Sequence, residues 1–397
     1  MKWVLLLDTY SPCRLNVTVE KEHATQTGES DREAELTILF RRMREYLVER
    51  VMGAAGGLAA RVALAMAVGS AAAVAQAQDL IEMRVQIYPG AYTSTTVHVA
   101  DEQGFFTNNG LKVEKIPAQS SSASIAALIG GSIDVVESGA DFVLANIDKG
   151  VGIKFVSANE VKNYATVIAS TKLDLPNAAK GYPDMMQDFK GKRIGVNAIG
   201  STLYLVAQMA LKDAGMSDDD VEFVATGTGA NTFAAWQAGS VDVQFTFAPV
   251  PELLEAIGLA KPILVLGNEG PEIVRFRGLY SGWVARDDYI ASNSKAIDAF
   301  VKSIQDAHEW IRDPANRQQL IEIAQKYSPV SGMSDEENVK VLTKVIENYD
   351  QFWGSQISEE AIDLWNDYSL RTNLIKRRIP FEKVVYSGAP RCETECR

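Results

Sequence analysis

The sequence is poor in the residues that most metal sites and many catalytic sites need. It contains only 3 cysteines and 3 histidines in 397 residues, too few for a disulfide framework or a zinc site. Its 39 lysines and arginines stand against 51 aspartates and glutamates, and the net charge of −12 disfavours binding to nucleic acid. No serine lies in a G-x-S-x-G motif. We therefore expect no metal, no cofactor, no nucleic-acid partner and no catalytic residue.

Long apolar segments are also missing. The run from Val62 to Ala75 is shorter than the ~20 residues of a membrane-spanning helix. It follows Arg61 and ends in alternating alanines, the A-x-A pattern of a secretory signal peptide. We expect cleavage after Ala75 or Ala77, which would place the mature protein in the periplasm. A buried alanine-rich helix is the alternative interpretation.

Residues 1–77 are thus assigned to a leader and signal peptide, with Met43 or Met52 as possible translation starts. The remaining chain exceeds one ordinary domain of about 100 to 200 residues. Hydrophobic residues make up 47% of the sequence, enough for buried cores. We expect two lobes in a monomer.

One unit of the sequence occurs twice. Residues 113–140 read VEKIPAQSSSASIAALIGGSIDVVESGA, and residues 221–248 read VEFVATGTGANTFAAWQAGSVDVQFTFA, without a gap between them in alignment. Each copy has the pattern of a strand, a loop of small residues, a helix, a Gly-Ser turn and a second strand. Upstream, RVQIY from Arg84 and RIGVN from Arg193 add a strand to each copy. The duplication predicts two similar lobes.

Alternating strands and helices predict an α/β fold with two parallel-sheet-rich lobes joined by a two-segment hinge. We assign residues 79–172 plus 277–397 to lobe 1 and residues 173–276 to lobe 2. The chain is expected to cross between the lobes near 170–174 and near 276–283. After 294 the pattern changes to amphipathic helices, which are expected to pack on lobe 1.

Loops rich in serine, threonine and glycine precede helices in both lobes. Free backbone N–H groups at such helix starts favour an anion, by roughly 0.3 to 1 kcal/mol for each helix. Because ligands of α/β sheets lie beyond the carboxyl ends of the strands, we expect these loops to face a cleft. Simple helix capping is the alternative role for each residue. The candidate ligand-binding residues are those of the loops together with nearby aromatic residues. They are Tyr88, Tyr92, Ser94, Thr95, Ser120, Ser121, Ser138, Gly139, Ala140, Gly200, Ser201, Thr202, Thr228, Phe247 and Ala248.

Three motifs resemble one family. They are VHVADEQGFFTNNGLKVE from Val97, AALIGGSIDVVESG from Ala126 and FKGKRIGVNAIGST from Phe189. These segments resemble the nitrate/sulfonate/bicarbonate group of solute-binding proteins of ABC importers, a taurine-type group that is related to the thiamine-precursor binders. The resemblance extends from about Met83 to Ile375.

The resemblance implies the type II periplasmic binding-protein fold, closure around one small solute, and docking on an inner-membrane ABC permease with its ATPase. By position, it carries ligand contacts over to Ser94, Thr95, Ser120, Ser121, Ser138, Gly139, Gly200, Ser201, Thr202 and Phe247. It does not identify the ligand. The thiamine pyrimidine synthases of a related branch use a cysteine-rich motif, and this chain has no cysteine between Cys13 and Cys392.

We favour a small organic anion, of the sulfonate or carboxylate type, as the ligand. Four alternatives stay open. They are a thiamine-precursor-like pyrimidine, a substrate of a tripartite ion-driven importer, an exported α/β enzyme, and a neutral or cationic precursor. For the last of these, acidic groups at Glu137, Asp141 and Glu160 would suit the cleft. Whether Cys392 and Cys396 pair is likewise open.

Overall fold

The computed structural model describes residues 3–7, 17–21, 80–118, 120–227, 230–329, 333–393 and 396. The chain forms two compact units, Met1–Gln78 and Asp79–Arg397. In the first unit, β1 (Trp3–Leu7) pairs antiparallel with β2 (Val17–Lys21). The predicted signal-peptide segment, residues 62–77, lies outside the described residues. No helix in the described segments is long and apolar enough to cross a membrane.

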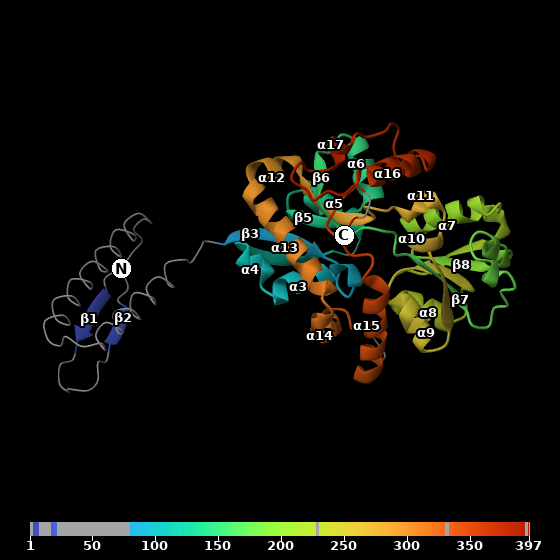
Figure 1. The fold of residues 1–397 in the computed structure, drawn as a ribbon, viewed down its shortest axis with the longest axis horizontal. Coiled ribbons are helices and arrows are strands. Elements are labelled where there is room, and N and C mark those ends of the chain that lie inside the picture. Colours follow the sequence, from blue (N-terminus) through green and yellow to red (C-terminus); the bar gives the residue numbers. More distant parts are fainter. Residues whose placement is uncertain are drawn as a thin grey trace. The chain divides into compact units, whose positions relative to one another are not determined.

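The second unit contains two separate sheets, as the duplicated sequence predicts (Figure 1). Each sheet has five strands. The first sheet has the order β4-β3-β5-β12-β6, and the second has the order β11-β7-β10-β8-β9. The strands of the first sheet are β3 (Ile81–Ile87), β4 (Leu111–Pro117), β5 (Val135–Gly139), β6 (Ile153–Glu160) and β12 (Ser281–Arg286). Those of the second sheet are β7 (Thr166–Ser170), β8 (Arg193–Val196), β9 (Glu222–Ala225), β10 (Val243–Thr246) and β11 (Ala260–Val265).

Each sheet is mixed rather than fully parallel. Strand β12 runs antiparallel to β5 and β6, and β7 runs antiparallel to β10 and β11. These are the two strands that follow the passages of the chain between the sheets. Each therefore starts at the edge where the parallel strands of its sheet end, and it runs in the opposite direction. The α/β class and the two-sheet architecture are confirmed.

Helices connect and cover the strands (Figure 1). Those associated with the first sheet are α3 (Thr95–Glu102), α4 (Phe105–Asn108), α5 (Ser121–Ile129) and α6 (Ala140–Asp148). The stretch from 202 to 275 holds α7 (Thr202–Asp213), α8 (Ala230–Gln237), α9 (Val250–Ala256), α10 (Leu266–Glu269) and α11 (Glu272–Arg275). After β12 follow α12 (Asp287–Ser292), α13 (Ser294–Arg312), α14 (Arg317–Tyr327), α15 (Asp335–Tyr349), α16 (Glu359–Arg371) and α17 (Phe381–Val384). Short 3-10 helices occupy Tyr92–Ser94, Ala178–Lys180, Asp184–Phe189, Asp218–Asp220 and Pro314–Asn316.

An ion pair repeats at the same place in both sheets. The Arg84 guanidinium donates to both carboxylate oxygens of Asp134, at 3.0 and 2.6 Å, and Arg193 holds Asp242 in the same way at 3.0 and 2.7 Å. In both copies the arginine backbone N–H also donates to the aspartate, at 2.9 and 3.0 Å. The Gly-Ser-x-Asp turn of the repeat thus attaches the start of β5 to β3 in the first sheet, and the start of β10 to β8 in the second. This shared role explains why the turn occurs in both copies.

The chain passes between the sheets earlier than predicted. Strand β7 belongs to the second sheet, so the first passage lies at 161–165 rather than at 170–174. The return passage follows α11 and ends at β12, inside the predicted range of 276–283. The two passages lie side by side, since the Gly278 N–H donates to the Val161 carbonyl at 2.7 Å. A third segment joins them, because the Val161 N–H donates to the Phe352 carbonyl at 2.7 Å.

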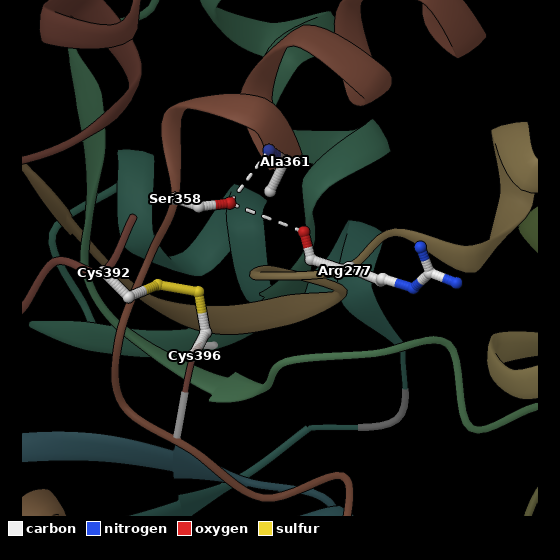
Figure 2. The surroundings of a disulfide bond; sticks show 5 residues. All are labelled: Arg277, Ser358, Ala361, Cys392 and Cys396. Atoms are coloured by element: carbon white, nitrogen blue, oxygen red, sulfur yellow. Dashed lines mark hydrogen bonds between the residues drawn. A yellow bond between two sulfur atoms is a disulfide. The ribbon is translucent and has the colours of Figure 1, made fainter. Parts of the chain in front are cut away.

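The C-terminal helices contact helices that are associated with each of the two sheets. Helices α13 and α14 pack against α3, and their apolar faces share one core with β3 and β12. Helix α15 reaches α9, where Lys344 pairs with Glu255 and the Asn348 amide donates to Glu252 at 3.0 Å. Residues after α17 end in a disulfide between Cys392 and Cys396 (Figure 2). Next to it, Ser358 accepts the Ala361 N–H at 3.1 Å and donates to the carbonyl of Arg277 at 3.5 Å (Figure 2).

Candidate functional site

Polar side chains lie at the edge of the first sheet where its parallel strands end. Strands β3, β4, β5 and β6 are mutually parallel and finish at this edge, and β12 begins there at Ser281. Ligands of α/β sheets bind at such an edge because the following loops and helix N-termini face it. Three groups of side chains occupy it: a tyrosine-serine cluster after β3, two buried glutamates, and a set of aromatic rings.

The tyrosine-serine cluster brings together three of the predicted residues. The Tyr88 hydroxyl lies 3.1 Å from Ser121 Oγ and donates to the carbonyl oxygen of Glu137 at 3.0 Å. The Tyr88 backbone N–H donates to Ser94 Oγ at 2.8 Å. Burial raises the pKa of Tyr88, so its hydroxyl stays protonated. The residue after β3 is thereby held to the 3-10 helix, α5 and β5.

Of the two glutamates, Glu137 lies in the middle of β5 and Glu160 is the last residue of β6. Glu160 is fully buried, and it accepts hydrogen bonds from Thr93 Oγ1 at 2.9 Å and Asn159 Nδ2 at 3.1 Å, and from Ser281 Oγ. Burial raises the pKa of Glu160 to about 7, because desolvation disfavours its charge more than the hydrogen bonds favour it. Burial and the neighbouring carboxylate of Glu160 raise the pKa of Glu137.

Aromatic rings from both sheets meet beside the glutamates. The Tyr164 ring, on the first passage, lies 4.6 Å from Phe247, 5.2 Å from Tyr280 and 4.9 Å from Tyr349, measured between ring centroids. Phe247 follows β10 of the second sheet, and Tyr349 ends α15. Phe247, which the sequence proposed for the cleft, is therefore part of this ring cluster.

The start of α7 contacts α6, the helix that follows β5 of the first sheet. Thr202, the first residue of α7, donates its hydroxyl to Asp141 Oδ2 at the start of α6. Asp141 is 5% exposed and burial raises its pKa, while its Oδ1 has no hydrogen-bond partner. Because a helix N-terminus attracts negative charge, the carboxyl group of Asp141 occupies the kind of place that the sequence predicted for an anionic ligand.

Other predicted residues have structural contacts. Ser201 and Ser120 cap helices, since their Oγ atoms accept the backbone N–H of Tyr204 and of Ala123, each at 3.2 Å. Tyr92 is 1% exposed and packs on Tyr349 with ring centroids 5.1 Å apart, so it belongs to the core. Gly200 has a φ of +79° and open space around its Cα, whereas a Cβ on Gly139 would lie 2.7 Å from Asp141 Oδ1. Thr95, Ser138 and Ala140 are buried, Ala248 is partly buried, and Thr228 lies outside the described residues.

Sequence reasoning missed much of the buried polar network. Thr93, Asn159, Tyr164, Tyr280 and Tyr349 were not proposed as site residues, although they surround Glu160 and Phe247. The missed signal is the polar run SANEVKNY from Ser157, which ends a buried strand and begins the passage to the second sheet.

The described residues offer no metal cluster, and their two histidines lie in structural contacts. No group of three or more histidine, cysteine or acidic side chains in the described chain could hold a metal ion. Burial lowers the pKa of His98 to about 4 and that of His308 to about 3. His98 stacks on Tyr327 with ring centroids 3.9 Å apart, and His308 Nε2 lies 3.3 Å from Thr96 Oγ1. Both histidines are therefore structural.

Known proteins are similar to this chain in sequence and in fold. The taurine-binding periplasmic protein of Escherichia coli (strain K12) is 25% identical over 230 residues, which are 55% of this chain and 66% of that relative. The periplasmic aliphatic sulphonate-binding protein SsuA of E. coli has a TM-score of 0.62 at 17% identity, covering 78% of this chain and 98% of its own. The alkanesulfonate-binding protein SsuA of Xanthomonas axonopodis pv. citri, bound to MOPS, has a TM-score of 0.61 at 19% identity, covering 80% of this chain and 100% of its own.

These similarities agree with the two-sheet architecture and with the resemblance noted in the sequence. The solved structures are too distant in sequence to establish more than the fold. The family model described as NMT1/THI5 like matches residues 92–316, more than half of the chain, and this segment contains both copies of the repeat. The protein belongs to the NMT1/THI5-like family.

Proposed function

We propose that this protein is an exported solute-binding protein that captures a small organic anion and delivers it to an ABC importer. The observation that carries the proposal is the meeting of polar groups from both sheets. Tyr88 and Ser121 lie at the edge of the first sheet, and the N-terminus of α7 faces that sheet through Thr202. The taurine-binding and sulfonate-binding names of the relatives support the sulfonate type among these anions.

In this proposal the protein is a monomer with two lobes, one built on each sheet, that close on the ligand. The predicted lobe boundary at 172/173 moves to the first passage at 161–165, because β7 lies in the second sheet. The permease and its ATPase recognise the closed form. The protein itself performs no chemical step. A thiamine-precursor-like pyrimidine is the second candidate, favoured by the tyrosine rings and by buried acidic groups that could accept hydrogen bonds from an aminopyrimidine.

Native mass spectrometry of protein purified from the periplasm without refolding tests the proposal, because a bound solute would be carried into the measurement. Calorimetry with alkanesulfonates, carboxylates and an aminopyrimidine then ranks the candidates. Conversion of the bound compound to a product would refute the binding-protein proposal and favour an enzyme.

Export is tested separately. We propose that the mature chain starts at Gln76 or Gln78, after the small residues of the A-x-A pattern. N-terminal sequencing of the periplasmic protein should find one of these residues. A mature protein that retains residues before Arg61 would contradict cleavage at this position.

A further inference from the structure

Strands β3 and β5 are neighbours in the first sheet, but they separate before they end. Strand β3 pairs with β4 along its whole length, from Ile81 to Ile87, whereas its ladder with β5 contains the single pair of Val85 with Val135. Strand β4 follows β3 in the chain and lies on one side of it, and β5 follows next and lies on the other side. Such a change of strand order, beyond the carboxyl ends of the strands, is where α/β sheets bind ligands. We call the place where these two strands separate the β3–β5 split.

Two side chains that follow one another along β3 occupy the β3–β5 split. The Glu137 N–H donates to Gln86 Oε1 at 2.9 Å, and the Glu137 carbonyl accepts from the Tyr88 hydroxyl at 3.0 Å. Gln86 is fully buried, and because it lies two positions before Tyr88, both side chains leave the same side of the extended chain. An N–H group needs an acceptor, so Glu137 fixes which end of the Gln86 amide is the oxygen. The other end is Nε2.

This Nε2 group has no hydrogen-bond partner in the part of the chain that the structure describes. A buried N–H without an acceptor costs free energy, so such groups are rare in folded proteins. Asn159 Oδ1 and Trp353 Nε1 are also unpartnered, but Asn159 belongs to β6 and Trp353 bridges to Glu160 at the end of β6. The edge thus leaves both donors and acceptors unpartnered, and of these three groups Gln86 Nε2 is the one in the β3–β5 split.

The second sheet holds a glutamine amide at the corresponding place, although the residue comes from another strand. Gly195 follows Arg193 by two positions in β8, as Gln86 follows Arg84 in β3. The side chain of Gln244, from β10, lies over this glycine: its Cδ is 3.0 Å from the position that a Cβ on Gly195 would take. The two copies of the repeat therefore place one buried amide each at this point of the sheet.

The Gln244 amide uses both of its ends within the protein. Its Oε1 accepts from the indole N–H of Trp236, and its Nε2 donates to Thr226 Oγ1 at 2.8 Å. The Thr226 hydroxyl in turn donates to the carbonyl of Val196 at 3.1 Å. In the second sheet this amide is thus a fully satisfied structural group.

The first copy lacks the hydroxyl that satisfies the amide in the second copy. The Thr226 N–H donates to the Val196 carbonyl at 2.8 Å, and the Ala118 N–H donates to the Ile87 carbonyl at 2.9 Å, so Ala118 holds the place of Thr226. Alanine has no hydroxyl to accept from Gln86 Nε2. A donor without an internal acceptor, at the ligand-binding edge of a sheet, is available to a bound solute.

We infer that Gln86 is a ligand-binding residue, whose Nε2 donates to an acceptor oxygen of the solute in the β3–β5 split. This inference rests on the proposed function and deepens it, because it places the oxygen-bearing end of the solute beside Tyr88 and Ser121. The Tyr88 hydroxyl already donates to the Glu137 carbonyl. Gln86 Nε2 therefore supplies a donor at this place that no contact within the described chain uses.

Gln86→Met tests the inference, because methionine is unbranched and similar in length to glutamine but has no N–H to donate. Gln244→Met is the matched control, since it removes the corresponding amide from the second sheet. Calorimetry of the mature protein with an alkanesulfonate gives the affinity, and urea denaturation gives the stability. Both variants should be less stable than wild type, because each loses hydrogen bonds within a sheet. Only Gln86→Met should bind the alkanesulfonate about tenfold or more weakly.

A spectroscopic measurement separates direct contact from a structural effect. In nuclear magnetic resonance spectra of nitrogen-labelled wild type, the side-chain NH2 signals of Gln86 are identified by their absence from Gln86→Met. Saturating alkanesulfonate should move these signals downfield, because the N–H gains an acceptor, and should leave the NH2 signals of Gln244 in place. If Gln86→Met does not fold, Gln86→Glu replaces it in both measurements, since glutamate keeps an oxygen for the Glu137 N–H.

Three results would overturn the Gln86 contact while leaving anion binding intact. They are an unchanged affinity in the Gln86 variant, an equal loss of affinity in the Gln244 control, and NH2 signals of Gln86 that do not move at saturation. Failure of wild type to bind the alkanesulfonate would overturn both this contact and the proposed ligand class.

Discussion

Replacing Thr202 by valine should loosen the contact between the two sheets. Valine has nearly the same shape as threonine but cannot donate a hydrogen bond. In the structure the Thr202 hydroxyl donates to Asp141 Oδ2, while Asp141 Oδ1 already lacks a donor. The variant therefore leaves both oxygens of a 5% exposed carboxyl group without a side-chain donor.

The size of the effect follows from that loss. Leaving a buried acceptor unsatisfied costs about 1 to 3 kcal/mol. Separation of the lobes would return the carboxyl group of Asp141 to water, so this free energy favours the open form. A difference of about 1 to 3 kcal/mol corresponds to a change of roughly 5- to 150-fold in the ratio of closed to open molecules. Apparent ligand affinity should fall as the closed fraction falls.

Small-angle scattering without added ligand is the direct assay, because Thr202→Val should increase the radius of gyration before any ligand contact is involved. Thr107→Val is the control: its hydroxyl donates to the Gly104 carbonyl at 2.9 Å on the exposed side of α4. In an Asp141→Ala background, Thr202→Val should have no further effect. A radius of gyration equal to that of wild type and of the control would refute the cross-sheet role of Thr202.

Three further predictions concern stability and binding. Because burial raises the pKa of Glu160 from 4.5 to about 7, the folded chain holds a proton that the unfolded chain has released in this range, so the free energy of unfolding should fall from about pH 4.5 to 7. Glu160→Gln should flatten this fall in urea denaturation, and an unchanged slope would contradict it. Ser120→Ala removes a helix cap and should cost about 0.5 to 2 kcal/mol of stability with little loss of ligand affinity. Ser121→Ala should instead weaken ligand binding about tenfold. Calorimetry of both variants with the tightest-binding probe distinguishes the two roles. Asp134→Asn should destabilise more than Asp242→Asn in denaturant titrations, since the Asp134 side chain is 7% exposed and that of Asp242 is 27% exposed.

The sequence repeat predicted the fold because local patterns determined it. The alternation of strands and helices defines the units, and the Gly-Ser-x-Asp turn recurs with its arginine partner on the preceding strand. The direction of β7 and β12 could not be read in the same way. Their residues are apolar, as in the parallel strands, and only the passage of the chain from the other sheet reverses them.

The site was predictable only where loops of small residues begin helices. This rule found Ser121, Ser201 and Thr202, but it could not tell a capping serine from a serine that faces another side chain. The rule also could not predict contacts between residues that lie far apart in the sequence. Glu160 meets Ser281 across 121 positions of the sequence, and Tyr164 meets Tyr349 from a helix that carries no repeat signal.

Asp141 connects the prediction of an anion with the position of the lobes. A helix N-terminus attracts negative charge whether the charge belongs to a ligand or to the protein. Here the start of α7 faces a carboxyl group from the first sheet, so an incoming anion would compete with Asp141 for Thr202. Asp141 is buried and its Oδ1 already lacks a hydrogen-bond partner, so taking Thr202 away from it would cost about 1 to 3 kcal/mol. An anion at the start of α7 would therefore have to gain more than this free energy from its own hydrogen bonds before it could displace Asp141.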